Sequence, residues 1–308
     1  MTVAPWIWAV FFAFILGLLG FDMLRHREAR TMSMREAIRW VAFYVALGLG
    51  FTFVVWAWQG GTAAGEYIAG YLIEYSLSVD NIFVFILLFS YFTVPAEHQH
   101  RVLFWGVLGA LVFRGAFIAG GAAILDTFHF MTYVFGAFLL VTAIRMARSD
   151  ELEVHPDKSL TLRVFRRLMP MTSGYRGGRF FVREDGRRLA TQLLAVVVVV
   201  EATDIVFAVD SIPAIFAVTR NTFIVYSSNA FAILGLRALY FVLQGMMRRF
   251  EYLQLGLAVV LGFVGVKMLL SDVYEIPIWA SLLFIIVTLT MAVLASLRKE
   301  SRSPGPTG

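Results

Sequence analysis

Long runs of apolar residues, separated by short polar segments, form the main pattern along the chain. These runs are about 17 to 25 residues long or longer, enough to cross a hydrocarbon core of about 30 Å as an α-helix. A helix satisfies its own backbone hydrogen bonds in lipid, whereas an isolated strand does not. The pattern therefore predicts nine transmembrane helices, near residues 3–21, 40–58, 67–92, 102–125, 128–144, 189–218, 223–243, 252–270 and 278–297.

The composition supports an all-α polytopic membrane protein. Of the 308 residues, 59% are hydrophobic, which is more than the surface of a water-soluble domain accommodates. The net charge of +5 would suit nucleic acid, but the basic residues lie in short segments between apolar runs, so we expect no nucleic-acid partner. The chain contains no cysteine, which excludes disulfides and thiolate metal ligands. The first apolar run has no basic residue before it and no cleavage site after it, so we expect it to be retained.

The basic residues also predict how the chain is oriented. All but four of the 26 Lys and Arg residues fall in alternate segments between spans, which the positive-inside rule assigns to the cytoplasm. Arg114 and Arg237 lie inside spans, and Arg220 and Lys267 lie toward the opposite side. We therefore expect a multi-pass protein of the cell's inner (plasma) membrane, with its N-terminus outside and its C-terminus in the cytoplasm.

The largest segment outside the predicted spans, residues 148–188, is basic and contains several glycines. Its Asp185-Gly186 pair follows apolar residues 180–182 and predicts a small β-hairpin or ordered loop. The charge of this segment sets the topology and also suits contact with anionic lipid headgroups. The chain otherwise divides into residues 1–66 with two helices and residues 272–308 with one helix and a tail expected to be disordered.

Two stretches of the chain resemble one another in three features. Each has an acid followed six positions later by Asp, then a span with one arginine, then a span that ends in a basic residue and Met. The matched pairs are Glu74 with Asp204, Asp80 with Asp210, Arg114 with Arg237, and Arg145 with Lys267. We predict a duplicated three-helix unit, residues 67–147 and 189–271. Because each unit has an odd number of spans, the two copies are inverted, as in secondary transporters whose substrate site lies near the midplane.

Acidic side chains lie deep within the predicted spans. They are Glu74, Asp80, Glu201, Asp204 and Asp210. A charged carboxylate at the bilayer centre costs about 3 kcal/mol or more unless it is paired, protonated, hydrated or bound to a cation. Salt bridges to the two intramembrane arginines would account for two of these acids. The remaining negative charge predicts a bound divalent cation or several protons.

Helix geometry limits how these acids share an ion. Residues six apart in an unbroken helix point about 240° away from each other and lie about 9 Å apart along the axis. Glu74 and Asp80 therefore share an ion only if the helix unwinds, for which residues 76–78 and, in the second unit, residues 211–213 are suitable places. The inverted repeat is expected to bring Asp80 and Asp210 together at the centre.

The expected ligands are all oxygen atoms. In this scheme Glu74 lies toward the outside, and Asp204 and Glu201 lie toward the inside, as further ligands or proton relays. We expect Asp80 and Asp210 to hold the cation with the side chains of Asn81, Asn229 and Ser211. Hard oxygen sites suit Mn²⁺, Mg²⁺ or Ca²⁺, whereas other transition metals usually recruit Cys or His. The five histidines lie in loops or at span ends and are expected to be solvated.

Three long segments carry a resemblance to a known family. They are YLIEYSLSVDNIFVF (71–85), VEATDIVFAVDSIPAIFAVT (200–219) and NAFAILGLRALY (229–240). Together they resemble the TerC family of integral membrane proteins, especially its Alx branch, over about residues 71–277. The resemblance implies a nine-span inner-membrane protein of metal homeostasis, with manganese export as its activity and tellurium resistance as an older label. It also implies that the family's metal site maps onto Asp80, Asn81, Glu201, Asp204 and Asp210, with Glu74 matching as well.

The residues alone leave other functional classes open. Two facing aspartates, such as Asp80 and Asp210, would suit an intramembrane aspartyl enzyme, although the expected Gly-x-Gly-Asp setting is missing. An interaction protein that assembles with other membrane components would use the acids only for packing. We expect a transporter rather than an enzyme, with Mn²⁺ or another divalent cation as cargo, exchange for protons, and membrane lipids around it.

Overall fold

The structure, a computed structural model, describes residues 3–25, 33–128, 130–148, 165, 167, 169–172, 174–184, 187–244, 252–270, 273–274 and 276–302. Its helices are α1 (Pro5–Arg25), α2 (Met34–Gln59), α3 (Gly61–Tyr91), α4 (Ala96–Thr127), α5 (Met131–Arg148), α7 (Gln192–Phe216), α8 (Thr222–Leu234), α9 (Leu236–Gln244), α10 (Leu253–Leu269) and α11 (Ile278–Arg302). Its strands are β1 (Phe181–Glu184) and β2 (Arg187–Ala190).

The helices lie where the apolar runs predict spans, with α8 and α9 together in the place of one. Within the described ranges, six helices are long and apolar enough to cross a membrane, and the bent pair α8 and α9 makes a seventh if it is one span. Helix α10 is apolar but shorter, and α5 carries two arginines in its last turn. The chain is therefore an all-α polytopic membrane protein, and the count of nine spans stays a prediction.

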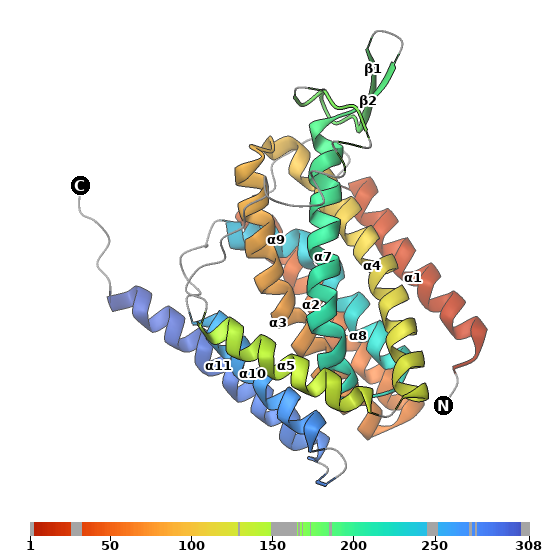
Figure 1. The fold of residues 1–308 in the computed structure, drawn as a ribbon, viewed down its shortest axis with the longest axis vertical. Helices are drawn as coiled ribbons and strands as arrows, with labels where there is room; N and C mark the ends of the chain where they lie inside the picture. Colours follow the sequence, from red (N-terminus) through yellow and green to blue (C-terminus); the bar gives the residue numbers. More distant parts are fainter. Residues whose placement is uncertain are drawn as a thin grey trace.

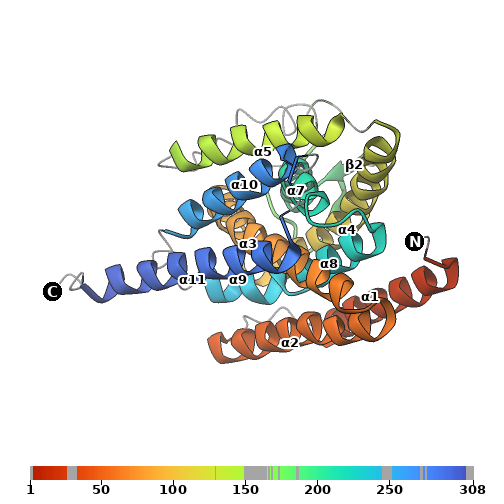
Figure 2. The same ribbon diagram turned by 90° about the horizontal axis from the view of Figure 1, so that it is seen from below.

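The helices form three groups across the bundle. Figure 2 shows α1 and α2 on one side, α5 and α10 on the other, and α3, α4, α7 and α8 between them. In Figure 1 the N-terminus lies at one end of the bundle and the β-hairpin at the opposite end. The middle group is the part of the molecule that holds the intramembrane acids.

Contacts between helices follow the predicted duplication. Helix α3 packs against α7, α4 against α8, and α5 most extensively against α10, so the equivalent helices of the two units meet. The cross pairs α3 with α8 and α4 with α7 are also in contact, and a two-fold relation requires both together. The inverted repeat itself stays a prediction, which these reciprocal contacts support.

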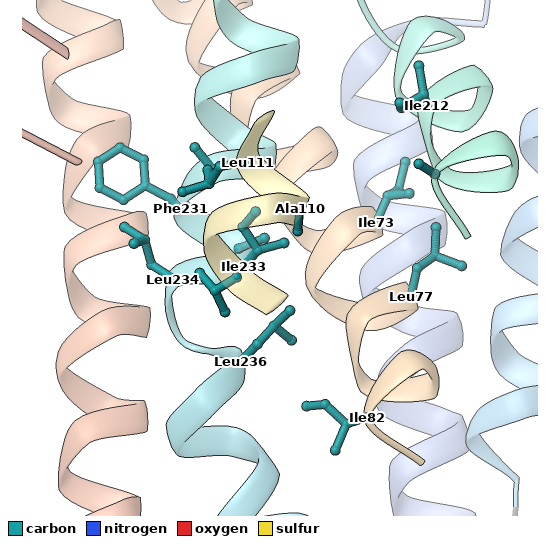
Figure 3. Packing of buried hydrophobic residues seen from close by; sticks show 14 of the residues in the cluster. Ile73, Leu77, Ile82, Ala110, Leu111, Ile212, Phe231, Ile233, Leu234 and Leu236 are labelled. Carbon is teal, nitrogen blue, oxygen red and sulfur yellow. The ribbon is translucent and has the colours of Figure 1, made fainter. Parts of the chain in front are cut away.

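The centre of the bundle is filled by aliphatic and aromatic side chains from α3, α4, α7 and α8. Figure 3 shows part of this core, in which Ile73 and Leu77 of α3 lie near Ile212 of α7, and Leu111 of α4 lies near Phe231 of α8. Lipid supplies no hydrophobic driving force between helices, so such close packing holds them together. Small residues permit it: at Gly265 of α10, a Cβ atom would lie 2.9 Å from the carbonyl oxygen of Gly136 in α5.

Local sequence signals set several helix ends. Ser33 caps α2 and its hydroxyl accepts a hydrogen bond from the backbone N–H of Glu36 at 3.4 Å, and Asn221 caps α8 by accepting from Phe223 N–H at 3.1 Å. The span predicted over residues 223–243 is broken at Gly235, where α8 and α9 meet at 42°. A Cβ at Gly235 would lie 3.2 Å from the Cβ of Tyr44 in α2, so glycine also allows this close approach.

The helix unwinding that Glu74 and Asp80 would need in order to share an ion is absent from the described structure of α3 and α7. Helix α3 continues through residues 76–78, and α7 continues through Pro213, which lies near its C-terminal end. Because α3 is continuous, the condition set for Glu74 and Asp80 to share one ion is not met.

The segment before α7 forms a hairpin that is attached to the bundle. Strands β1 and β2 pair antiparallel, with Val182 opposite Leu189, at the place where the sequence predicts a hairpin or ordered loop. The Tyr175 hydroxyl donates a 2.7 Å hydrogen bond to the carbonyl oxygen of Phe92, and Arg101 lies over the ring of Phe180, 5.0 Å from its centre. Burial raises the pKa of Tyr175 to about 12, so this hydroxyl remains a donor at neutral pH.

Candidate functional site

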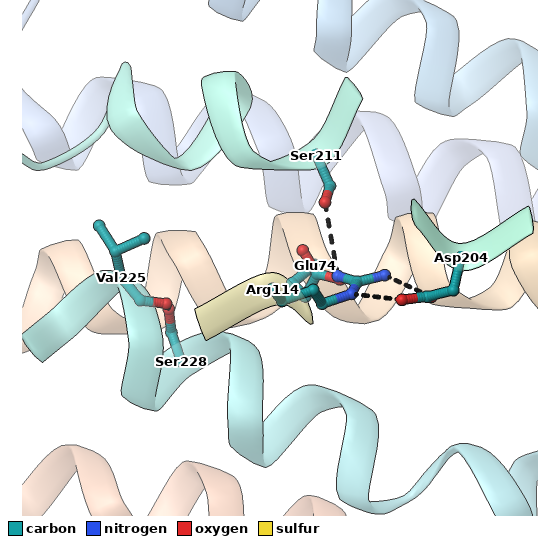
Figure 4. A network of polar contacts seen from close by, with 6 residues as sticks. All are labelled: Glu74, Arg114, Asp204, Ser211, Val225 and Ser228. Atoms are coloured by element: carbon teal, nitrogen blue, oxygen red, sulfur yellow. Dashed lines mark hydrogen bonds and ion pairs between the residues drawn. The ribbon is translucent and has the colours of Figure 1, made fainter. Parts of the chain in front are cut away.

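One buried arginine gathers carboxylates from two helices. Arg114 of α4 has no exposed surface, and its guanidinium contacts Glu74 of α3 and Asp204 of α7 (Figure 4). It donates to Asp204 through two bonds, Nε to Oδ2 at 3.1 Å and Nη2 to Oδ1 at 3.0 Å. Nη1 binds Glu74 Oε1 and also lies 3.4 Å from the hydroxyl oxygen of Ser211. A planar guanidinium suits this bidentate arrangement, which a lysine ammonium does not reproduce.

Helical periodicity explains why these groups meet. Glu74, Ser78 and Asn81 lie at positions i, i+4 and i+7 and therefore share one face of α3. Glu201 and Asp204 lie at i and i+3 on α7, so they also face one direction. Because α3 and α4 both pack against α7, the two polar faces meet at Arg114.

Several buried polar atoms on α3, α7 and the neighbouring α8 have no hydrogen-bond partner among the described residues. They are Glu74 Oε2, Ser78 Oγ, Tyr71 Oη, Glu201 Oε2 and Asn229 Nδ2. A buried polar group without a partner costs about 1 to 3 kcal/mol, and more when it is charged. Oxygen atoms left open in this way point to a ligand or to water, because nothing else offsets their removal from solvent.

Glu201 lies against α4 at a position where only glycine leaves room. A Cβ atom at Gly109 would overlap the Glu201 carboxylate. Within the described part of the protein, no basic side chain forms an ion pair with Glu201. Another acid, Asp204, lies one helical turn away on α7. Two carboxylates, those of Glu74 and Asp204, therefore share the guanidinium of Arg114, and the third, that of Glu201, lies against α4 near Gly109.

The structure brings some of the predicted ligands together and not others. Glu74 and Asp204 share one guanidinium, so their carboxylates lie at the same depth. The prediction that Glu74 lies toward the outside and Asp204 toward the inside is therefore wrong. The backbones of Asp80 and Asp210 lie in α3 and α7, but their side chains fall outside the described part, so their meeting stays a prediction.

The remaining predicted ligands are buried on neighbouring helices. Asn81 of α3 is 4% exposed, and Asn229 of α8 is 1% exposed. Ser211 of α7 is 2% exposed and contacts Arg114. Among the residues whose side chains are described, no three acidic or histidine side chains are grouped as a metal site. A cation site here needs amide or hydroxyl oxygens, or the side chains of Asp80 and Asp210.

The second intramembrane arginine has a different partner from its equivalent in the first unit. Arg237 of α9 forms a buried ion pair with Asp22 of α1, next to Tyr44 of α2. Sequence reasoning missed Asp22, because the first span was predicted to end at Phe21 and an acid just beyond it reads as solvated. Helix α1 instead continues to Arg25, and Asp22 is 5% exposed. A lone arginine inside a span was the available signal that a buried acid had to lie opposite it.

Comparison with known proteins places this architecture in a family. Residues 59–303 match the integral membrane protein TerC family. The chain belongs to the TerC family. A membrane protein of Myxococcus xanthus is 47% identical over 303 residues, covering 98% of this chain and 95% of its own length. No solved structure matches the chain significantly.

Two other relatives come from different membranes. The Alx protein of Escherichia coli (strain K12), named as a membrane-bound redox modulator, is 45% identical and is covered over 94% of both chains. The thylakoid membrane protein TERC of Arabidopsis thaliana chloroplasts is 44% identical, covering 92% of this chain and 73% of the relative. The resemblance found in the three sequence segments is thus confirmed for the TerC family and its Alx-like members.

Proposed function

We propose that this TerC-family protein transports divalent metal cations, that Mn²⁺ is its cargo, and that the direction is export. One observation carries the proposal: two carboxylates, Glu74 and Asp204, share one guanidinium in the middle of the bundle, a third, Glu201, lies one helical turn from Asp204 with no described ion-pair partner, and Glu74 and Glu201 each have a buried oxygen that no described group binds. Uncompensated carboxylates inside a membrane usually mark a cation or proton pathway. Oxygen donors suit Mn²⁺, Mg²⁺ and Ca²⁺.

The site supports transport better than the other two classes. An aspartyl enzyme needs two carboxyl groups that share a proton; the pair considered for it, Asp80 and Asp210, lacks the Gly-x-Gly-Asp setting, and the described acids Glu74 and Asp204 are both bound to Arg114. We propose that the protein is not an enzyme. A scaffold needs no unsatisfied oxygen atoms in its core. Redox modulation, which the name of Alx suggests for that relative, cannot use thiol chemistry in this chain, because it has no cysteine.

We propose that the protein lies in the inner (plasma) membrane of the cell. In the proposed orientation, the hairpin end of the bundle faces the cytoplasm. The hairpin at that end carries Arg183 in β1 and Arg187 and Arg188 in β2, and the positive-inside rule assigns such basic segments to the cytoplasm (Figure 1). We also propose that protons return as the metal leaves, since the carboxylates can hold either. The proposal does not depend on the oligomeric state of the protein. We expect membrane lipid to surround the outer helices.

Flux measurements on purified protein in liposomes test the proposal. We expect the wild-type protein to move Mn²⁺ in preference to Zn²⁺, with a linked pH change inside the vesicles. We expect Asp80→Asn to insert normally and to lose Mn²⁺ flux by about tenfold or more, because a ligand charge is removed from the pathway. Glu97→Gln, at an exposed position in the first turn of α4, is the matched control and should transport as the wild type does.

Other results of the same assay contradict the proposal. A scaffold would move no metal and would be indifferent to Asp80→Asn. Mn²⁺ flux without any pH change would contradict proton exchange but agree with metal transport. Equal flux by the wild type and Asp80→Asn would contradict a pathway that passes Asp80 on α3.

A further inference from the structure

The two equivalent arginines of the repeat differ in what they bind. Arg237 is held by Asp22 of α1. Arg114 binds Glu74 and Asp204, which occupy equivalent positions in the two units. A positive charge therefore lies between the two helices that carry the predicted metal ligands.

A carrier of divalent cations has to return without its cargo. At that stage any carboxylate that has not taken up a proton is ionised inside the membrane with no metal to balance it, which is unfavourable in a medium of low dielectric. A guanidinium bound to both carboxylates balances one negative charge and satisfies three of their oxygen atoms. Arg114 supplies this charge from within the protein.

We propose that Arg114 is a tethered counter-cation that competes with the transported metal for Glu74 and Asp204, an inference that rests on the proposed transport function. The cation displaces the guanidinium when it binds, and the guanidinium returns when the cation leaves. The guanidinium thereby weakens metal binding. It also permits the empty protein to turn its binding site from one side of the membrane to the other. Arg114 acts through these carboxylates and is a positioning residue rather than a metal ligand.

The surroundings of Arg114 allow such an exchange. The hydroxyl oxygen of Ser211 lies 3.4 Å from Nη1. It can accept a hydrogen bond from the guanidinium when the guanidinium is displaced from Glu74. Glu74 Oε2 and Ser78 Oγ are buried on the same face of α3 with no described partner, so they can accept a cation. Neither position requires α3 or α7 to unwind.

Three measurements on Arg114→Gln test this role: equilibrium Mn²⁺ binding, net Mn²⁺ efflux from liposomes, and exchange of labelled for unlabelled Mn²⁺ across the membrane. We expect Mn²⁺ to bind about tenfold more tightly, because the competing charge is gone. Net efflux should fall about tenfold or more, while exchange stays within about threefold of wild type, because only net transport requires the empty protein to return. The control is the double variant Asp22→Asn/Arg237→Gln, which removes the other arginine together with its acid. It should leave Mn²⁺ binding, net efflux and exchange unchanged.

A merely structural role would give a different outcome. If Arg114 only clamps α3 to α7, Arg114→Gln loses binding, exchange and net efflux together, and the inference is overturned. Should this variant fail to fold, Arg114→Lys decides: a single ammonium holds the carboxylates less well, so tighter Mn²⁺ binding with retained net efflux is expected, and unchanged or weaker binding overturns the role. Absence of flux in the wild type would reject the transport function itself, whereas flux with equal losses in Arg114→Gln would reject only the role of Arg114.

Discussion

Asp204→Asn is expected both to destabilise the protein and to abolish metal flux. The amide keeps the shape of the side chain but turns an NH₂ group toward a guanidinium that only donates, so one of the two bonds from Arg114 is lost. Arg114 keeps Glu74 as a partner, so the loss is that of a charged hydrogen bond, about 1.5 to 3 kcal/mol of unfolding free energy. At about 2 to 4 °C per kcal/mol, the midpoint of thermal unfolding in detergent should fall by roughly five to ten degrees.

Glu201→Gln is the matched control for this variant. Glu201 is on the same face of α7, but no described side chain forms an ion pair with it, so its neutralisation should leave the unfolding midpoint close to wild type. Flux should nevertheless fall, because a carboxylate of the pathway is gone. Equal unfolding midpoints for Asp204→Asn and the wild type would contradict the clamp described at Arg114.

Asp22→Asn is expected to have the second large effect, on stability alone. The substitution removes the carboxylate from Arg237 in a buried setting between α1 and α9, and we expect a loss of about 3 to 5 kcal/mol. The double variant Asp22→Asn/Arg237→Gln removes both charges and should recover most of this loss. Thermal unfolding in detergent measures both.

Transport separates this pair from the central site. Once folded, the double variant should carry Mn²⁺ at the wild-type rate, because this pair joins α9 to α1, whereas the central acids Glu74 and Asp204 are bound by Arg114. If Asp22→Asn is as stable as the wild type, the ion pair of Asp22 and Arg237 contributes nothing to the stability of the fold. Loss of flux in a stable double variant would place Arg237 in the pathway after all.

The sequence was sufficient to locate the helices and the acids but not to pair the charges. Span positions follow from apolar runs alone, and so does the buried position of Glu74 and Asp204. Which acid an arginine binds depends on the rotation of each helix and on its neighbours. Arg114 and Arg237 have the same place in the repeat, yet one binds two carboxylates of the centre and the other binds Asp22 of α1.

The depth of the acids was misjudged for a geometric reason. A two-fold axis in the membrane plane moves equivalent residues to opposite depths unless they lie near the axis. That axis was expected at Asp80 and Asp210; if the two units are related by such an axis, the guanidinium shared by Glu74 and Asp204 requires it to lie close to those two acids instead. The break at Gly235 was likewise hidden, because the sequence there reads as one continuous apolar run.

Locating the bound ion tests the central claim most directly. In a structure determined with Mn²⁺, anomalous scattering should place the ion between α3 and α7, about 2.0 to 2.6 Å from carboxylate and other oxygen atoms, as for other hard divalent cations. The guanidinium of Arg114 should have moved away from at least one of its two carboxylates. Mn²⁺ found only at the protein surface, with Glu74 and Asp204 both still bound to Arg114, would contradict the account.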